Sequence, residues 1–245
     1  MIEGIELAAT GLDAYTNVQE VIARNLANAN TVGFKKNTIS FETVLTQIEG
    51  VETSSLETHY GIDYSKGDLT YTGNTLDIAV DGDGFFTLET GNGMRYTRNG
   101  QFQLSSDGEI VTSTGSKVLG EDGPSGLGSP IQIPKRSTEI VIDINGNVKV
   151  DGNEIGKLMI THFNDSDLLV PTGNSSFAAP LESINVTGIA SFTVAQGYLE
   201  GSNVSVVMEM VDMIANMRSY EASNNVIKTY SDLMEQLIAN QSNIA

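Results

Sequence analysis

The chain has no cysteine and no tryptophan among its 245 residues. The absence of cysteine excludes disulfide bonds, thiolate metal sites and cysteine nucleophiles. Basic residues are also scarce, with 13 Lys and Arg against 31 Asp and Glu, which gives a net charge of -18. Because affinity for nucleic acid depends on clustered Lys and Arg, this balance argues against nucleic acid as a partner.

Long hydrophobic runs are missing as well. No apolar segment approaches the roughly 20 residues that a membrane span requires, so we expect no direct membrane insertion. The N-terminus, MIEGIELAATGLDAY, has glutamates where a signal peptide has lysine or arginine. We therefore expect a soluble chain that, if it leaves the cytoplasm, does so without a cleaved Sec-type signal.

Residue patterns typical of enzymes are few. The two histidines, His59 and His162, have no obvious triad or metal partners, and no GxSxG, P-loop or HExxH motif occurs. The stretch DINGNVKVDGNE (143–154) resembles a calcium loop, but Val148 replaces the glycine required at its sixth position, and β-type runs flank it. A hairpin with two turns is the better interpretation. The sequence thus predicts a protein that is not an enzyme, with no catalytic residues, no cofactor and no metal.

Helical periodicity marks both ends of the chain. Apolar residues recur three or four apart from Ile5 to Ala29 and again from Val207 to Leu237, which is the spacing of one helix face. Between these segments, short β-type runs alternate with turns rich in Gly, Asn and Asp. The dipeptide Asn145-Gly146 predicts a two-residue hairpin turn of type I′.

These patterns predict a mixed α and β fold with three parts. N- and C-terminal helices, within 1–45 and 197–245, pair as a coiled-coil-like domain; an extended connector covers 46–67; an all-β domain covers 68–196. A pair of helices with one apolar stripe each is marginal alone, because most helix stability comes from tertiary packing. We therefore expect the ends to become fully ordered only when copies of the chain stack. The alternative is an ordinary helical hairpin that caps the β domain.

The first helical pattern ends in NLANANTVGFKK, residues 25–36. Several of its residues are suited to end a helix and shape a turn: Asn25, Asn28, Asn30, Thr31, Gly33 and Phe34. In GSNV (201–204), Ser202 or Asn203 is placed to act as the N-cap of the last helix. Both features are compatible with plain capped helix ends.

Three stretches resemble one known family. NLANANTVGFKK after an amphipathic helix resembles the signature of the flagellar rod and hook proteins, the axial-protein family of the bacterial flagellar basal body. Residues 74–123 resemble the β-domain block of that family, and residues 197–238 resemble its C-terminal helix. The resemblance implies export by the flagellar type III apparatus and helical polymerisation into a rod that crosses the periplasm. It also implies an inner tube of terminal helices with the β domain outside.

The resemblance further assigns roles to particular residues. A joint between the inner helix and the connector is expected to involve Asn25, Asn28, Thr31, Gly33, Phe34, Gly201, Ser202, Asn203 and Val204. Packing between the helices of neighbouring subunits is expected to involve Leu12, Ile22, Leu26, Met210, Ile214, Met217 and Tyr220.

Within this family the chain is too short for a hook protein. Its short connector, together with EGSNV and DMIAN, favours a proximal-rod member, with a distal-rod member as the alternative. The expected function is mechanical: a helical polymer of this chain, joined to neighbouring rod proteins, transmits torque from motor to hook. A different class stays open, namely a secreted surface or adhesin-like β protein. Such a protein would stay monomeric, and helical stripes at both ends would be unexplained.

Overall fold

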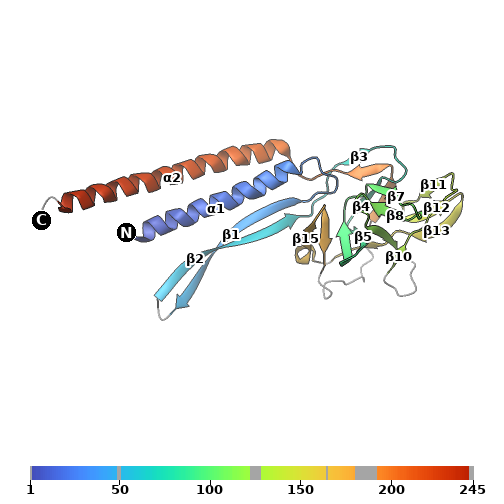
Figure 1. The fold of residues 1–245 in the computed structure, drawn as a ribbon, viewed down its shortest axis with the longest axis horizontal. Coiled ribbons are helices and arrows are strands. Elements are labelled where there is room, and N and C mark those ends of the chain that lie inside the picture. Colours follow the sequence, from blue (N-terminus) through green and yellow to red (C-terminus); the bar gives the residue numbers. More distant parts are fainter. Residues whose placement is uncertain (1, 49–50, 122–127, 164, 180–191, 243–245) are drawn as a thin grey trace. The chain divides into compact units, whose positions relative to one another are not determined.

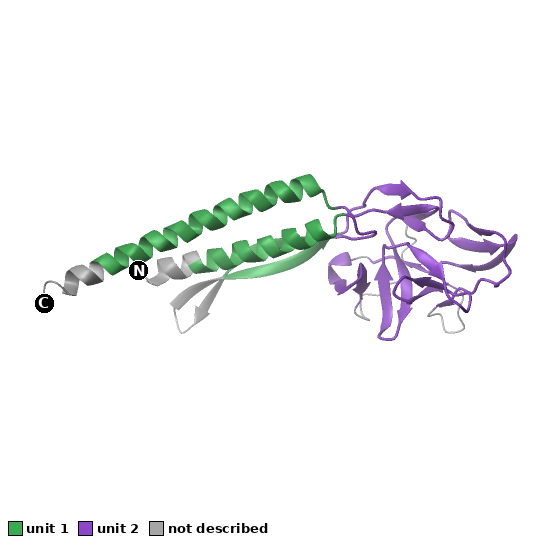
Figure 2. Cartoon of the chain, turned by 45° about the horizontal axis from the view of Figure 1, so that its top comes forward, with its two compact units in different colours: residues 1–29, 36–63, 204–245 green, residues 30–35, 64–203 purple. Residues whose placement is uncertain are grey.

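The computed structural model describes residues 2–48, 51–121, 128–163, 165–179 and 192–242. Helix α1 (Ile2–Ala27) lies at one end of the chain and helix α2 (Val206–Ser242) at the other, and the described residues between them are rich in strands (Figure 1). The predicted mixed fold, with terminal helices flanking a β-rich middle, is confirmed. The chain forms two compact units, which we call unit 1 (1–29, 36–63 and 204–245) and unit 2 (30–35 and 64–203; Figure 2).

Unit 1 contains both helices and one long β-hairpin. Helix α1 contacts α2 and also β1 (Lys36–Ile48), which pairs with β2 (Val51–Asp63). The antiparallel register runs without interruption from Lys36 opposite Asp63 to Ile48 opposite Val51.

This hairpin corrects the predicted extended connector over 46–67, since residues up to Asp63 belong to a paired strand. The sequence signal was weak for a physical reason. Most of the side chains from 56 to 61 are exposed, so no apolar alternation is required in that part of β2, where backbone pairing defines the strand.

Unit 2 is built on antiparallel pairs. Its largest sheet has the strand order β15 (Val170–Gly173), β16 (Ser176–Ala178), β6 (Gly93–Thr97), β5 (Phe85–Thr90), β9 (Lys117–Gly120), β8 (Ile110–Thr112) and β7 (Phe102–Leu104). Two short strands join it off this path, β10 (Ser129–Pro130) on β9 and β14 (Ile160–Thr161) on β5. The remaining strands form a three-stranded sheet of β11 (Ile140–Ile142), β12 (Asn147–Val150) and β13 (Asn153–Lys157), and the pairs β17 (Phe192–Gln196) with β4 (Ile78–Gly82) and β18 (Tyr198–Glu200) with β3 (Leu69–Tyr71). A short 3-10 helix, η1 (Ser166–Leu168), precedes β15.

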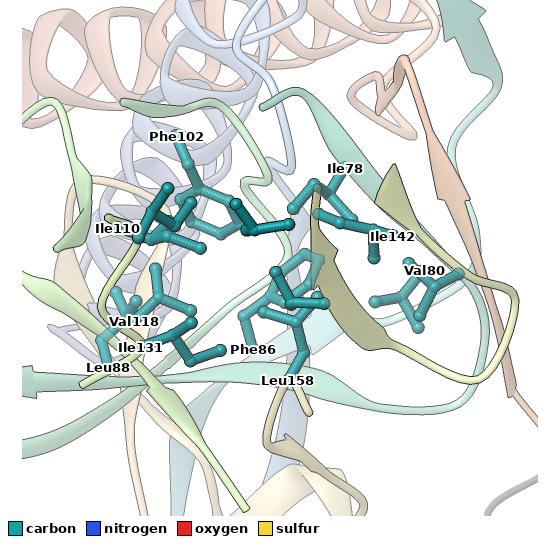
Figure 3. Close-up of a cluster of buried hydrophobic side chains, with 14 residues drawn as sticks. Ile78, Val80, Phe86, Leu88, Phe102, Ile110, Val118, Ile131, Ile142 and Leu158 are labelled. Atoms are coloured by element: carbon teal, nitrogen blue, oxygen red, sulfur yellow. The ribbon is translucent and has the colours of Figure 1, made fainter. Parts of the chain in front are cut away.

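The core of unit 2 is apolar and comes from several of these sheets (Figure 3). Ile78, Phe86, Ile110, Val118 and Leu158 are completely buried. Burial of side chains of this size contributes roughly 1.5–3 kcal/mol each, so this cluster is the main source of stability in unit 2.

Hairpins β11–β12 and β12–β13 confirm that residues 143–154 form two turns and correct the predicted turn type. Gly146 has a φ of 84°, but Asn145 has no positive φ, and Asp143 pairs with Asn147 through a backbone bond of 3.1 Å across a three-residue loop. The Asp143 carboxylate favours this loop because it accepts from the backbone amides of Asn145 (2.9 Å) and Asn147 (3.0 Å). The hydrogen bonds from Asn147 also lower the pKa of Asp143.

The type I′ turn lies six residues further along the chain. Asp151 and Gly152, between β12 and β13, have φ values of 49° and 85°, and the strands pair directly at Val150 and Asn153. A two-residue loop with positive φ at both positions matches the twist of the flanking strands.

Candidate assembly site

Asn28 ends α1, as the sequence predicted for this polar segment. Its side-chain amide donates to the carbonyl of Arg24 at 2.8 Å, which satisfies one of the last helical acceptors. The following residues, 30–35, belong to unit 2. There the amide of Phe34 donates to the carbonyl of Thr31 at 3.2 Å, and Gly33 has a φ of 66°. Thr31, Gly33 and Phe34 therefore form a tight turn directly after the helix.

Gly33 is required in this turn for two independent reasons. Its positive φ is strained for any residue with a Cβ atom. A Cβ atom would also lie against the backbone of Arg98 and Asn99, which cannot move aside as a flexible side chain can. The amide of Gly33 donates to the carbonyl of Glu200 at 2.8 Å, so the turn is fixed to the end of β18.

Unit 2 contains a buried ion cluster, which we define as Lys35, Arg98 and Glu200. The Lys35 ammonium lies 2.7 Å from Oε1 of Glu200, and one guanidinium nitrogen of Arg98 lies 3.4 Å from Oε2. All three side chains are almost completely buried. A buried ion pair is stable only when further hydrogen bonds satisfy its remaining polar atoms.

The cluster has such bonds at each of its charged groups, although the Nε of Arg98 has no hydrogen-bond partner among the described residues. Lys35 donates to the carbonyl of Ser65 at 2.7 Å, and the amide of Gly67 donates to Glu200 at 3.0 Å. Arg98 donates to the carbonyls of Val80 (3.1 Å) and Gly82 (2.8 Å). The cluster thereby ties together residues 33–35, 65–67, β4 and β18.

The electrostatics of Arg98 follow from its burial. Desolvation lowers the pKa of the guanidinium, and the negative charge of Glu200 opposes this shift. The guanidinium carbon lies 5.0 Å from the centre of the Phe85 ring, a favourable cation–π distance. Inside unit 2, the charge of Arg98 is therefore stabilised by Glu200 and by the ring of Phe85.

Unit 1 contains a second polar cluster, formed by Asn25, Lys36, Asn37 and Glu209. The amide group of Asn25 donates to the carbonyl of Asn37 (2.9 Å) and to Glu209 (3.2 Å), and its oxygen accepts from the amide of Asn37 (2.8 Å). The Lys36 ammonium lies 2.6 Å from the other oxygen of Glu209. Asn25 and Glu209 are each only 1% exposed, so Asn25 connects α1, β1 and α2 from inside the unit.

The two lysines of NLANANTVGFKK thus bind two different glutamates. Lys35 pairs with Glu200 in unit 2, and Lys36 pairs with Glu209 in unit 1. The glutamates flank GSNV, so the two segments that the family resemblance singled out are linked within each unit. Lys35, Lys36, Arg98, Glu200 and Glu209 were absent from the predicted joint. The available signal was a charged residue, Glu209, inside the apolar run VVMEMV.

Contrary to the prediction, neither Ser202 nor Asn203 of GSNV caps α2. The helix begins at Val206, and the carbonyl of Ser205 accepts the first helical bond, from Glu209 at 3.0 Å. Ser202 and Asn203 therefore lie outside the cap position. Asn203 instead donates to the carbonyl (3.2 Å) and hydroxyl (3.0 Å) of Ser65. The backbone amide of Gly201 donates to the backbone carbonyl of Asp68 at 2.9 Å. Val204 is buried.

Two polar residues of helix α2 lie inside unit 1, while an apolar stripe of the same helix faces outward. Glu209 and Asn216 are buried, and Asn216 donates to the carbonyl of Tyr15 in α1 at 2.9 Å. The opposite face is a continuous apolar stripe whose members are at least 46% exposed: Val207, Met210, Val211, Ile214 and Met217. A helix of a self-contained protein turns such a stripe toward the core.

The predicted packing residues fall into two groups. Ile22 is buried, and Leu12, Leu26 and Tyr220 are half-buried within unit 1. Met210, Ile214 and Met217 belong to the exposed apolar stripe.

Three family models match the chain. They are described as "Flagella basal body rod protein" (residues 5–35), "Flagellar hook protein FlgE/F/G D1 domain" (79–150) and "Flagellar basal body rod FlgEFG protein C-terminal" (195–240). The match over 5–35 contains Asn25 and Lys35, the match over 195–240 contains Glu200 and Glu209, and the match over 79–150 contains Arg98.

Curated relatives match over nearly the whole chain. The flagellar basal-body rod protein FlgG of Agrobacterium fabrum is 33% identical, with 95% of this chain and 97% of the relative covered. FlgG of Bacillus subtilis is 29% identical, covering 97% and 98%. The rod protein FlgF of Mesorhizobium japonicum is 29% identical, covering 97% of both chains.

Proposed function

Since this chain belongs to the flagellar basal-body rod protein family, we propose that it is a structural subunit whose copies assemble through the exposed apolar stripe of α2. Its role in the flagellar basal-body rod is structural and not enzymatic, as for the family. The stripe carries the proposal, because five adjacent apolar side chains of one helix have no cover within the described part of the chain. Burying the exposed half of each contributes on the order of 1 kcal/mol per side chain.

The proposed arrangement is a coiled-coil-like inner tube of terminal helices with the β-rich part outside. The exposed apolar stripe supports it, since helices packed into a tube would cover these side chains.

The remaining elements of the proposal concern partners and location. We expect neighbouring proximal and distal rod proteins on either side of this chain, export through the flagellar type III apparatus without a cleaved signal peptide, and a rod that crosses the periplasm and transmits torque to the hook. None of the helices in the described residues is both long and apolar enough to cross a membrane.

We propose the proximal position, that of FlgF, over the distal position of FlgG. The alignment with Agrobacterium FlgG runs over 266 positions, more than this chain has, whereas the alignment with Mesorhizobium FlgF runs over 240. Length therefore favours FlgF, although identity to FlgG is slightly higher. Electron microscopy of basal bodies from a deletion strain separates the two: loss of the proximal rod supports FlgF, and loss of only the distal segment supports FlgG.

The assembly surface is tested by complementing that deletion strain with Ile214→Gln. Glutamine has high helix propensity, so α2 is kept while the centre of the stripe becomes polar. We expect complete rods and swimming to be strongly reduced. Glu221→Gln, at an exposed position of the same helix, is the matched control and should restore both. Normal rods with Ile214→Gln would refute the role of the stripe.

A further inference from the structure

Methionine is the only sulfur-containing residue type in this chain, and its distribution is uneven. Four of the eight methionines lie within ten residues of α2, at positions 208, 210, 213 and 217. Met208 is 57% exposed, Met210 52% and Met217 46%, whereas Met213 is half-buried. Methionines of unit 2 differ, since Met94 and Met159 are both half-buried.

We propose that Met208, Met210 and Met217 are oxidation sites, and that their conversion to sulfoxides blocks self-association of this chain. The inference rests on the proposed function, because Met210 and Met217 belong to the apolar stripe of α2. The reactants are peroxides, which donate one oxygen atom to a thioether.

The chemistry needs only the side chain and the oxidant. The thioether sulfur attacks one oxygen of hydrogen peroxide, an S–O bond forms, and the O–O bond breaks. The second oxygen leaves as water after proton transfer. Sulfur is oxidised by two electrons, peroxide is reduced by two, and the product is methionine sulfoxide.

The consequence follows from the position of the two stripe methionines. Met210 and Met217 each lie about one helical turn from Ile214, one on either side of it along the helix, so both contact whatever covers Ile214. A sulfoxide is polar and chiral, and burying it without a hydrogen-bond partner is unfavourable. Because the same side chains are exposed in the free chain, oxidation is favoured before assembly and disfavoured after it.

Absence of cysteine makes this response specific. In most proteins a thiolate reacts with peroxide first, but this chain has none. The exposed thioethers of α2 are therefore the most accessible two-electron reductants among the described residues.

The test uses the full purified chain and hydrogen peroxide, with excess oxidant removed by catalase. Peptide mass spectrometry measures the added oxygen at each methionine, and sedimentation velocity measures self-association. We expect Met208, Met210 and Met217 to be oxidised before Met94 and Met159, and self-association to weaken at least tenfold. Treatment with two methionine sulfoxide reductases, one for each epimer, should restore it.

Two variants make the result specific. The triple variant Met208→Leu, Met210→Leu and Met217→Leu keeps the stripe apolar, and its association is compared with that of its own untreated sample: peroxide should leave this ratio unchanged, whereas the wild type loses at least tenfold. The double variant Met94→Leu and Met159→Leu should remain as sensitive as the wild type. Within the wild type, association should decline in step with oxidation of Met210 and Met217 and not with that of Met213.

Distinct outcomes would overturn distinct claims. An untreated wild type that does not self-associate contradicts the proposed function together with this inference. A wild type that associates equally well before and after oxidation of Met210 and Met217 contradicts the inference alone. Equal loss of association in the triple variant after peroxide treatment would also contradict it.

Discussion

Glu200 is the residue on which the buried ion cluster of unit 2 depends. Its carboxylate is the one negative charge in the cluster and binds Lys35, Arg98 and the amide of Gly67. Removing one partner of a buried ion pair costs more than the pair itself contributes, because an uncompensated charge stays behind.

Glu200→Gln should therefore destabilise unit 2 by about 3–5 kcal/mol, measured by urea unfolding. Lys35→Met combined with Glu200→Gln should cost less than the two single changes together. The control is Glu121→Gln, which breaks the exposed pair between Glu121 and Lys157 and should cost less than about 1 kcal/mol. Equal effects of Glu200→Gln and Glu121→Gln would show that burial of the cluster does not matter.

Gly33→Ala tests the turn after α1. We expect a loss of at least about 2 kcal/mol, since strain at positive φ adds to displacement of the Arg98 and Asn99 backbone. Gly93→Ala separates the two causes, because Gly93 has a φ of 97° with open space around it and should show strain only. Similar losses in both variants, again by urea unfolding, would exclude the steric contribution.

Tyr64 gives a prediction about pH. Its buried hydroxyl has no hydrogen-bond partner among the described residues, and desolvation raises its pKa above the ordinary value of 10.0. The folded state then keeps a proton that the unfolded state loses, so stability should fall as the pH rises above about 10. Tyr64→Phe keeps the edge-to-face contacts with Phe85 and Phe177 and should be neutral or stabilising at pH 7.

The same variant should flatten the decline above pH 10 only partly, because burial also raises the pKa of Tyr96. Chemical unfolding at pH 7 and at several higher pH values measures this. A marked loss of stability at pH 7 in Tyr64→Phe would mean that the hydroxyl has a partner. Tyr64→Ala, which also removes the ring, should cost about 3–5 kcal/mol.

At the scale of elements, the β1–β2 hairpin is long for the support it has. Isolated two-stranded hairpins are marginal in water, and much of this one has exposed side chains, including Phe41, Leu56 and Tyr60. Glu42 lies directly opposite Glu57, and like charges in such pairs are destabilising. Among the described residues, the ion pair of Glu42 with His59, at 3.6 Å, offers partial compensation when the histidine is protonated.

Glu57→Lys should therefore make the hairpin open less often, by about 0.5–1 kcal/mol. Amide hydrogen exchange of β1 and β2 measures this opening locally. Glu57→Gln removes repulsion without adding attraction and should give an intermediate protection. Unchanged exchange in both variants would show that the cross-strand pair has no influence on the hairpin.

At the scale of the molecule, the periodicity of apolar residues predicted the features that depend on burial of apolar side chains. The terminal helices and the β-rich middle follow from apolar spacing, and the turn after α1 follows from Asn28 and Gly33. The ion pairs could not be predicted in this way, because Lys35 and Glu200 are 165 residues apart in sequence and no local pattern connects them. The cap of α2 was misplaced because Ser202, Asn203 and Ser205 are equally suitable by residue type, and only the tertiary contact of Asn203 with Ser65 distinguishes them.

The exposed stripe of α2 shows a second feature that periodicity does not predict. Spacing identifies an apolar face, but it does not say whether that face is covered by the same chain. Here Glu209 and Asn216 find polar partners in α1, at Asn25 and Tyr15, so the side of α2 that contains them, and not the stripe, is held against α1.

Lys35 and Lys36 also determine how susceptible the chain is to a protease that cuts after lysine. The peptide bond between them joins a segment of unit 2 to one of unit 1. Both side chains are held by glutamates, and that of Lys35 is wholly buried, so it cannot enter a protease pocket until its ion pair opens. The rate of cleavage at this bond therefore reports how often the segment opens locally, and the carboxylates of Glu200 and Glu209, which lie far away in the sequence, control that opening.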